Sequence, residues 1–273
     1  MQTFKKRRVL FILSVVLLVS SGCEYNKILN KGTNEQKLEA ARKYYKKKDY
    51  NRASILLENL IGNFRGEQAE EVYYLFAYSK FAMQEFYMAQ HLFTNFTTSY
   101  PNSKYATQAA FMSARCQYHQ ALASELDQTN TTQAIEAIQI FINRYPTNDS
   151  VESGNKLIDE LRSRLHEKAF NSAMLYFNME NYLAAYTAFK NAIINYPDLP
   201  EIEKAHYYKV ESAYRYAKQS VKSVQEERYE TTIVAAKDFL EATQENKYTP
   251  KVKDLMEKSK LAIEELKKIS EQQ

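Results

Sequence analysis

The chain of 273 residues is poor in glycine, proline and cysteine and has no tryptophan, with five glycines, five prolines and two cysteines in all. Tight hairpins and phosphate-cradling loops both depend on glycine, so this composition argues against a hairpin-rich β fold and against a glycine-rich nucleotide site. Helix-forming residues dominate, and apolar residues recur at three- and four-residue steps without sustained alternation. The sequence therefore predicts an all-α fold.

Catalytic and metal-binding motifs are missing from the sequence as well. There is no nucleophile elbow and no His-Glu-x-x-His. Ser153 to Lys156 matches Ser-x-x-Lys by letter, but the accompanying motifs of that chemistry are absent, so we interpret the match as chance. We expect no enzyme activity, no metal and no dissociable cofactor.

The two cysteines have different expected roles. Cys23 ends the N-terminal apolar segment, which leaves Cys116 without a disulfide partner. Cys116 lies in a run of small and apolar residues that predicts a helix, so we expect a buried, unreactive thiol. His119 three residues later is at most half a metal site, since no second pair with ligand spacing exists among the other histidines, His91, His166 and His206.

The N-terminus predicts a secretory signal peptide over residues 1–22. Residues 5–8 are Lys-Lys-Arg-Arg, residues 9–19 form an apolar run, and Ser20-Ser-Gly-Cys23 follows. A membrane span would need about 20 apolar residues, more than this run offers. The alternative is an ordinary secreted protein in which Cys23 is incidental.

The end of this segment resembles the bacterial lipobox, although Ser20 stands where leucine is usual. The resemblance implies that Cys23 receives a diacylglyceryl group, becomes the first residue after cleavage, and is then acylated on its amino group. Stable membrane anchoring needs at least two lipid chains, which such a residue would carry. We therefore expect a lipid anchor at Cys23, followed by a polar tether over residues 23–34.

Charge in the mature chain is balanced. Four of the 37 Lys and Arg residues precede Cys23, which leaves 33 against 33 Asp and Glu. A basic surface for nucleic acid is not indicated by this balance, and we expect no nucleic-acid partner.

One pattern of apolar residues recurs five times at offsets of 0, 3, 7, 10 and 14. Steps of three and four place these residues on one helical face, so each copy predicts the second helix of a helical hairpin. Proline directly follows the last aromatic residue in three copies, where a helix must stop. The copies are Tyr50, Ala53, Leu57, Leu60, Phe64; Phe86, Ala89, Phe93, Phe96, Tyr100; Thr131, Ala134, Ile138, Phe141, Tyr145; Tyr182, Ala185, Phe189, Ala192, Tyr196; and Tyr229, Thr232, Ala236, Phe239, Thr243.

These hairpins resemble tetratricopeptide repeats, which have about 34 residues per unit. The copies are 36, 45, 51 and 47 residues apart, so we expect longer loops or helix extensions near residues 126–130, 147–150 and 221–227. The resemblance predicts a superhelical array of about five hairpins over residues 35–248. Thr249-Pro250 then begins a capping helix that covers the last unit over residues 249–273.

The register of the repeat family implies a peptide-binding groove formed by the first helices. In the second unit this register places Tyr74, Tyr78 and Phe81 toward the groove, and in the first unit it places Leu38 and Arg42 there. An extended or helical peptide with aromatic residues would dock on such a surface. The alternative is that these tyrosines pack against a neighbouring helix.

The whole plan resembles the YfiO-like family of outer-membrane β-barrel assembly lipoproteins. A sequence motif typical of that family is present as Phe93-x-x-Phe96-x3-Tyr100-Pro-x-Ser-x-Tyr105. Residues 126–146 look like the corresponding segment of family members from Bacteroidetes-type bacteria. The resemblance implies a scaffold on the periplasmic side of the cell outer membrane. It would hold the POTRA-bearing barrel subunit through its C-terminal units and receive unfolded outer-membrane proteins at its N-terminal units.

Two other binding functions remain open from the sequence. A tetratricopeptide-repeat lipoprotein of cell division or envelope maintenance shares the Phe-x-x-Phe-x3-Tyr-Pro-x-Ser phrase, but such proteins usually carry a coiled coil, and no sustained heptads occur here. A glycan-binding surface lipoprotein is the other. Carbohydrate platforms favour tryptophan, which this chain lacks.

Overall fold

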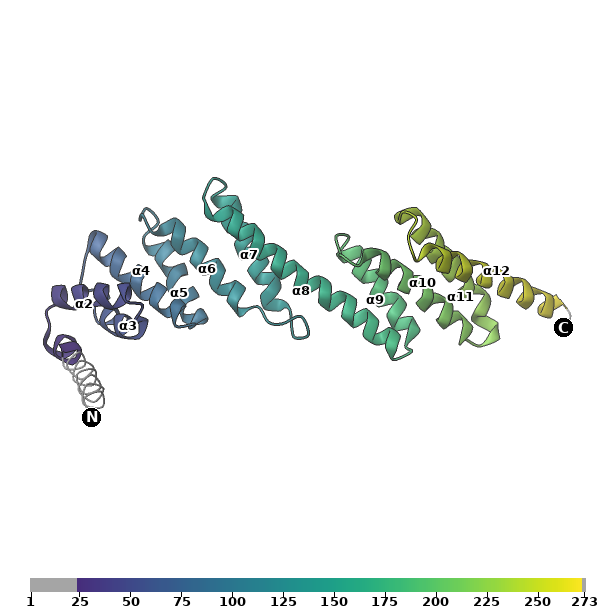
Figure 1. Cartoon of the computed structure of the whole chain (residues 1–273), viewed down its shortest axis with the longest axis horizontal. Coiled ribbons are helices and arrows are strands. Elements are labelled where there is room, and N and C mark those ends of the chain that lie inside the picture. The colour runs from purple at the N-terminus through teal and green to yellow at the C-terminus, as the bar shows by residue number, and fades with distance from the viewer. Residues whose placement is uncertain (1–23, 272–273) are drawn as a thin grey trace, which may run out of the picture. The chain divides into compact units, whose positions relative to one another are not determined.

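A computed structural model of the chain describes residues 24–271, and every regular element in that range is a helix (Figure 1). The predicted all-α class is confirmed. The predicted signal peptide and Cys23 lie outside the described residues. The helices are α2 (Asn34–Lys46), α3 (Tyr50–Glu58), α4 (Gly66–Ala82), α5 (Phe86–Ser99), α6 (Ala106–Gln120), α7 (Thr129–Arg144), α8 (Ser150–Asn178), α9 (Tyr182–Asn195), α10 (Ile202–Lys218), α11 (Lys222–Ala242) and α12 (Thr249–Glu271).

The chain divides into two compact units, and the boundary falls within α8. Unit 1 runs to Leu122 and also takes in Gln128–Leu161, so it contains α2 to α7 and the first part of α8. Unit 2 comprises Ala123–Asp127 and the chain from Arg162 onward, with the rest of α8 and α9 to α12. Within each unit, helices that follow one another in sequence pack side by side, as α5 packs on α6 and α10 on α11.

Burial follows the repeat pattern closely. The side chains at offset 3 are fully buried in all five copies, and so are those at offset 7. Alanine or threonine at offset 3 lets the two helices of a hairpin approach closely, and in the first four copies a larger residue at offset 7 fills the space beside it. The predicted register is therefore confirmed at Ala53, Ala89, Ala134, Ala185 and Thr232, and at Leu57, Phe93, Ile138, Phe189 and Ala236.

Three hairpins have turns of the same type. Lys48, Gln84 and Glu180, each two residues before the first residue of a copy, have φ of 61°, 63° and 59°. In each turn the amide of the positive-φ residue donates to the carbonyl three residues earlier, and the amide of the following residue donates to the carbonyl five residues before itself. In the second hairpin, for example, the Gln84 amide donates to the Phe81 carbonyl and the Glu85 amide donates to the Lys80 carbonyl. This bonding is a Schellman C-terminus, which usually has glycine at the left-handed position. Three non-glycine residues therefore carry backbone strain here.

The extra residues between copies lie mainly in helices. The 29 residues of α8 account for the longest interval, since this single helix belongs to both units. At the predicted extension near residues 221–227, α11 begins at Lys222, seven residues before Tyr229. A non-helical connection from Ala121 to Gln128 lengthens the second interval.

The predicted tether is not an extended polar segment. Residues 24–31 are helical, and Tyr25 is only 8% exposed in the core cluster of unit 1, with Ile28 and Leu29 packed against that cluster. Apolar residues at i, i+3 and i+4 gave this segment a buried face, which favours helix over an extended chain. A helix rises about 1.5 Å per residue against at most about 3.6 Å for an extended chain, so residues 24–31 span a much shorter distance than an extended tether of the same length.

The array ends in α12, which packs against α11 in unit 2. The backbone amide of Asn246 donates to Oγ1 of Thr249 at 3.0 Å at the start of this helix. Val252 is fully buried in the last core cluster, and Leu255 and Met256 pack against that cluster. The helix thereby covers an apolar face of α11 that would otherwise meet water.

Candidate functional site

The residues predicted to line a groove lie on two first helices of unit 1. Leu38 and Arg42 are on α2, and Tyr74, Tyr78 and Phe81 are on α4. The structure brings α2 beside α3 and α4 beside α5, with a direct contact between α2 and α4. The five residues therefore share one compact unit, but they do not share one environment.

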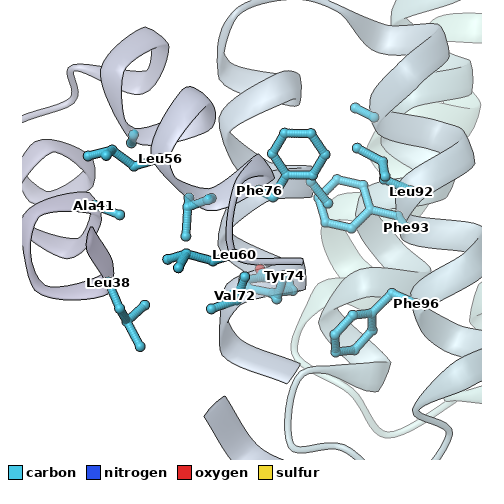
Figure 2. Packing of buried hydrophobic residues seen from close by; sticks show 14 of the residues in the cluster. Leu38, Ala41, Leu56, Leu60, Val72, Tyr74, Phe76, Leu92, Phe93 and Phe96 are labelled. Carbon is cyan, nitrogen blue, oxygen red and sulfur yellow. The ribbon is translucent and has the colours of Figure 1, made fainter. Parts of the chain in front are cut away.

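Leu38 and Tyr74 belong to the core. They are 2% and 4% exposed, and Figure 2 shows both among the buried side chains of this cluster. The ring of Tyr74 stacks on that of Tyr105, with 4.7 Å between centroids and 12° between planes. Burial also raises the pKa of the Tyr74 phenol. Packing against neighbouring helices therefore accounts for these two residues, and neither side chain presents a surface to a ligand.

Arg42 is half exposed and pairs with Glu71 on α4. Its Nε donates to Oε1 at 2.7 Å and its second guanidinium nitrogen donates to Oε2 at 2.5 Å. The hydrogen bonds to this carboxylate raise the pKa of Arg42. This two-point geometry fixes the planes of both groups and connects the first helices of two successive hairpins.

Tyr78 stays partly exposed at the centre of a group of tyrosines. Its ring centroid lies 5.6 Å from that of Tyr45 and 6.1 Å from that of Tyr50. Burial raises the pKa of Tyr45 well above its ordinary value, with the neighbouring phenols adding to the effect. The Tyr45 hydroxyl therefore stays protonated at neutral pH, and the group offers hydrogen-bonding hydroxyls beside aromatic faces.

Phe81 continues the aromatic surface toward α6. Its centroid is 5.5 Å from Phe86 and 5.4 Å from His119, and the Arg115 guanidinium lies 5.2 Å from its ring centre. His119 in turn stacks on Phe86, with centroids 4.5 Å apart. We name the partly exposed residues of this row the aromatic strip: Arg42, Tyr45, Tyr78, Phe81, Arg115 and His119.

The chemical groups of the aromatic strip suit the binding of another chain. It offers aromatic faces, phenol hydroxyls and guanidinium groups, which recognise peptide carbonyls and aromatic side chains. Cys116, the one thiol among the residues of unit 1 that the structure describes, is fully buried, and burial raises its pKa to about 12. The predicted burial of this thiol is confirmed, and at neutral pH it remains a protonated thiol.

A second site was missed by sequence reasoning. A pocket of about 870 Å³ lies between the helical segment 24–31 and α2. The sequence signal for this pocket was a charge pattern: lysines lie four residues apart in segment 24–31 and are clustered at the end of α2. The sequence did not show that these two groups of lysines lie together, because that depends on how segment 24–31 folds back on α2. Its lining includes Glu24, Lys27, Ile28, Lys31, Gly32, Gln36, Glu39, Ala40, Arg42, Lys43, Tyr44, Lys46 and Lys47.

Unit 2 contains a buried polar group between α10 and α11. Lys209 is 6% exposed, and its Nζ donates to Oδ2 of Asp238 at 3.0 Å. His206 lies beside them, and burial, aided by the Lys209 charge, lowers its pKa to about 4. The imidazole is therefore neutral at physiological pH. This cluster joins two helices of the core and gives no open surface for a ligand.

Across residues 24–271, no three His, Cys, Asp or Glu side chains are gathered so that they could hold a metal ion. None of the helices described for the chain is long and apolar enough to cross a membrane.

Comparison with known proteins gives one informative match. The model of the YfiO family, described as outer membrane lipoprotein, matches residues 30–231. No curated protein sequence matches the chain. Eighteen chains of solved structures match, among them one from work on the computational design of self-assembling cyclic protein homooligomers. That chain is 17% identical over 96% of this chain and 99% of its own length, but its TM-score of 0.19 supports no argument about fold.

Proposed function

The chain belongs to the YfiO family of outer membrane lipoproteins, and on that premise we propose that it is a periplasmic scaffold of the β-barrel assembly complex, of the BamD type. It would bind the POTRA-bearing barrel subunit and unfolded outer-membrane proteins, and so support their folding and insertion. Its action is binding and conformational control without bond chemistry.

The family match is the observation that carries this proposal. Residues 30–231 run from the end of the first helical segment into α11, so the match includes helices of both units. The similarity therefore extends over the repeat array as a whole and not over one widespread hairpin. The buried repeat positions described above supply the architecture that such a scaffold needs.

The proposed anchor is a lipid on Cys23, carrying diacylglycerol and an N-acyl chain such as palmitate. Labelled palmitate fed to cells should appear in the parent protein and in the Cys116→Ala variant, but not in Cys23→Ala. Cys116 is the matched control because it is the chain's other cysteine and its thiol is buried. Equal labelling of Cys23→Ala would end the lipoprotein proposal.

The aromatic strip is the proposed contact for unfolded outer-membrane proteins. Such chains carry aromatic residues and unpaired backbone groups. The rings of Tyr78 and Phe81 can pack against those aromatic residues, and the guanidinium of Arg115 can donate to backbone carbonyls. Of the predicted groove residues, Arg42, Tyr78 and Phe81 keep this role, because their side chains are at least partly exposed.

Unit 2 is the proposed attachment for the POTRA-bearing subunit. Around the turn between α8 and α9 four large apolar side chains are exposed, at 58% for Leu175, 42% for Tyr176, 67% for Met179 and 48% for Leu183. Exposed apolar residues grouped at one turn are typical of protein-binding surfaces. Substitutions at this turn can therefore test the proposed attachment of the POTRA-bearing subunit.

Depletion of the protein in cells tests the proposed function. We expect folded outer-membrane β-barrel proteins to fall together while septation continues until the envelope fails. Unchanged barrel levels with a septation or peptidoglycan defect would instead support a division or envelope-maintenance protein. Loss of glycan binding alone would support the surface lipoprotein.

A further inference from the structure

We propose that the lysine pocket, the cavity of about 870 Å³ between residues 24–31 and α2, binds the phosphate of anionic phospholipid headgroups and thereby holds unit 1 against the membrane surface. This goes beyond the proposed scaffold function, which needs only the lipid on Cys23. The inference does rest on that lipid for the position of the pocket at the membrane.

The pocket has rigid walls because the segment 24–31 is fastened to unit 1. Tyr25 is buried, and its ring packs edge-on against Tyr44, with centroids 5.5 Å apart. The Arg52 guanidinium lies 5.5 Å from the centres of both rings. These contacts hold the segment at a fixed place beside α2, so its lysines are presented from a folded surface and not from a loose tail.

Gly32 closes the pocket where the segment turns into α2. A Cβ at this position would lie 2.5 Å from the carbonyl oxygen of Ile28, closer than real Cβ atoms approach. The amide of Gly32 donates to that same oxygen at 2.9 Å. Glycine is therefore needed for the close approach that ends the first helix and brings its lysines next to those of α2.

The charge of the lining is strongly positive. Five lysines face two carboxylates, those of Glu24 and Glu39, and among the described residues none of the five has an ion pair. Arg42 adds little, because Glu71 already neutralises it at 2.5 Å. The mature chain is neutral as a whole, so this excess is a local property. The five are Lys27, Lys31, Lys43, Lys46 and Lys47.

The place of the pocket in the chain identifies its ligand. Glu24 lines the pocket and directly follows Cys23, so the wall begins one residue, about 3.8 Å between Cα atoms, from the proposed lipid attachment. A residue this close to acylated cysteine lies at the level of the lipid headgroups, where phosphate is the most abundant anion. Basic side chains next to a lipid anchor add a second, salt-sensitive attachment to the first.

Vesicle flotation with the unlipidated mature chain, carrying Cys23→Ser, tests the pocket apart from the anchor. The pocket variant combines Lys27→Gln, Lys31→Gln and Lys43→Gln. The control removes the same charge from three exposed lysines of unit 2, in Lys190→Gln, Lys237→Gln and Lys253→Gln. Because all six lysines are exposed, circular dichroism should show the same helix content and melting curve for every protein.

We expect the parent and the control to float with vesicles that contain phosphatidylglycerol and not with pure phosphatidylcholine, and we expect high salt to release them. Each pocket lysine should contribute roughly a fivefold change in affinity, so the pocket variant should lose most binding. A pocket variant that floats as the parent does would overturn the proposal. The proposal would also be overturned if sodium phosphate shifted the NMR signals of the pocket residues while the parent protein did not float with any vesicle, since the site would then hold a soluble anion. Failure here leaves the lipidation test on Cys23 untouched.

Discussion

Arg42 and Glu71, 29 residues apart in the chain, join α2 to α4 through two hydrogen bonds of 2.7 and 2.5 Å. Each helix begins a different hairpin, so the pair sets the position of one hairpin against the next. The Arg42 side chain is 42% exposed and that of Glu71 23%, which places the pair in the range where solvent weakens but does not cancel an ion pair.

The energy of this pair is measurable by a double-mutant cycle. Arg42→Ala, Glu71→Ala and the double variant should give a coupling free energy of about 0.5–1 kcal/mol from urea unfolding, because the geometry is two-point but partly solvated. The coupling should shrink in high salt. Additive effects of the two single variants would show that the pair contributes nothing to stability.

Overpacking at the small repeat position should destabilise unit 2. Ala185 is fully buried between the helices of its hairpin, so Ala185→Leu should lower the free energy of unfolding by about 1–3 kcal/mol. Ala242 is an exposed alanine in α11, and Ala242→Leu should change stability little. An unchanged melting curve for Ala185→Leu would contradict the repeat register.

Replacing a strained turn residue by glycine should stabilise unit 1. Gln84 has φ of 63° at an exposed hairpin turn, where a side chain costs about 1 kcal/mol that glycine does not. Gln84→Gly should therefore raise the free energy of unfolding by up to about 1 kcal/mol. Gln84→Ala keeps a Cβ and should give no comparable gain. A destabilised Gln84→Gly protein would show that the strain is not relieved in the folded state.

The buried imidazole of His206 should make stability depend on pH. Its folded pKa is lowered to about 4 by burial and the Lys209 charge, with Asp238 opposing, while the unfolded value is near 6.5. The unfolded chain thus binds a proton that the folded chain does not, and stability falls as pH falls from about 6.5 toward 4.

The size of this loss is at most about 3 kcal/mol, and it should be absent in His206→Gln. Urea unfolding at several pH values compares the two slopes. His91→Gln, at an exposed histidine, should keep the slope of the parent protein. If His206→Gln retains the full slope, other groups cause the acid sensitivity.

The repeat helices could be predicted because their signal is local. Offsets of 3 and 7 within one helix place Ala89 and Phe93 on one face, and a face that repeats five times must be buried against a neighbour. Tyr100, Tyr145 and Tyr196 have nearly the same backbone conformation, with φ between −131° and −134°, because each precedes proline. Both features depend only on nearby sequence.

The burial of two of the predicted groove residues and the existence of the lysine pocket could not be predicted in the same way. Whether Leu38 and Tyr74 face a groove or the core depends on which helices cover them, and Tyr105, 31 residues beyond Tyr74, supplies part of that cover. The pocket needed the segment 24–31 to fold back through Tyr25, and a polar composition suggested a tether instead. Contacts between distant residues decided both outcomes.

The most direct test of the central claim is to identify the protein that binds the surface proposed on unit 2. The full chain, tagged at its C-terminus, is crosslinked in cells, solubilised from the outer membrane and purified. A Met179→Glu variant is treated in the same way, and so is an Ile140→Glu control at a similarly exposed apolar site in unit 1. We predict that a POTRA-bearing β-barrel protein copurifies with the parent and the control and is reduced at least several-fold with Met179→Glu. Recovery of division or peptidoglycan-synthesis proteins without any POTRA-bearing protein would contradict the account.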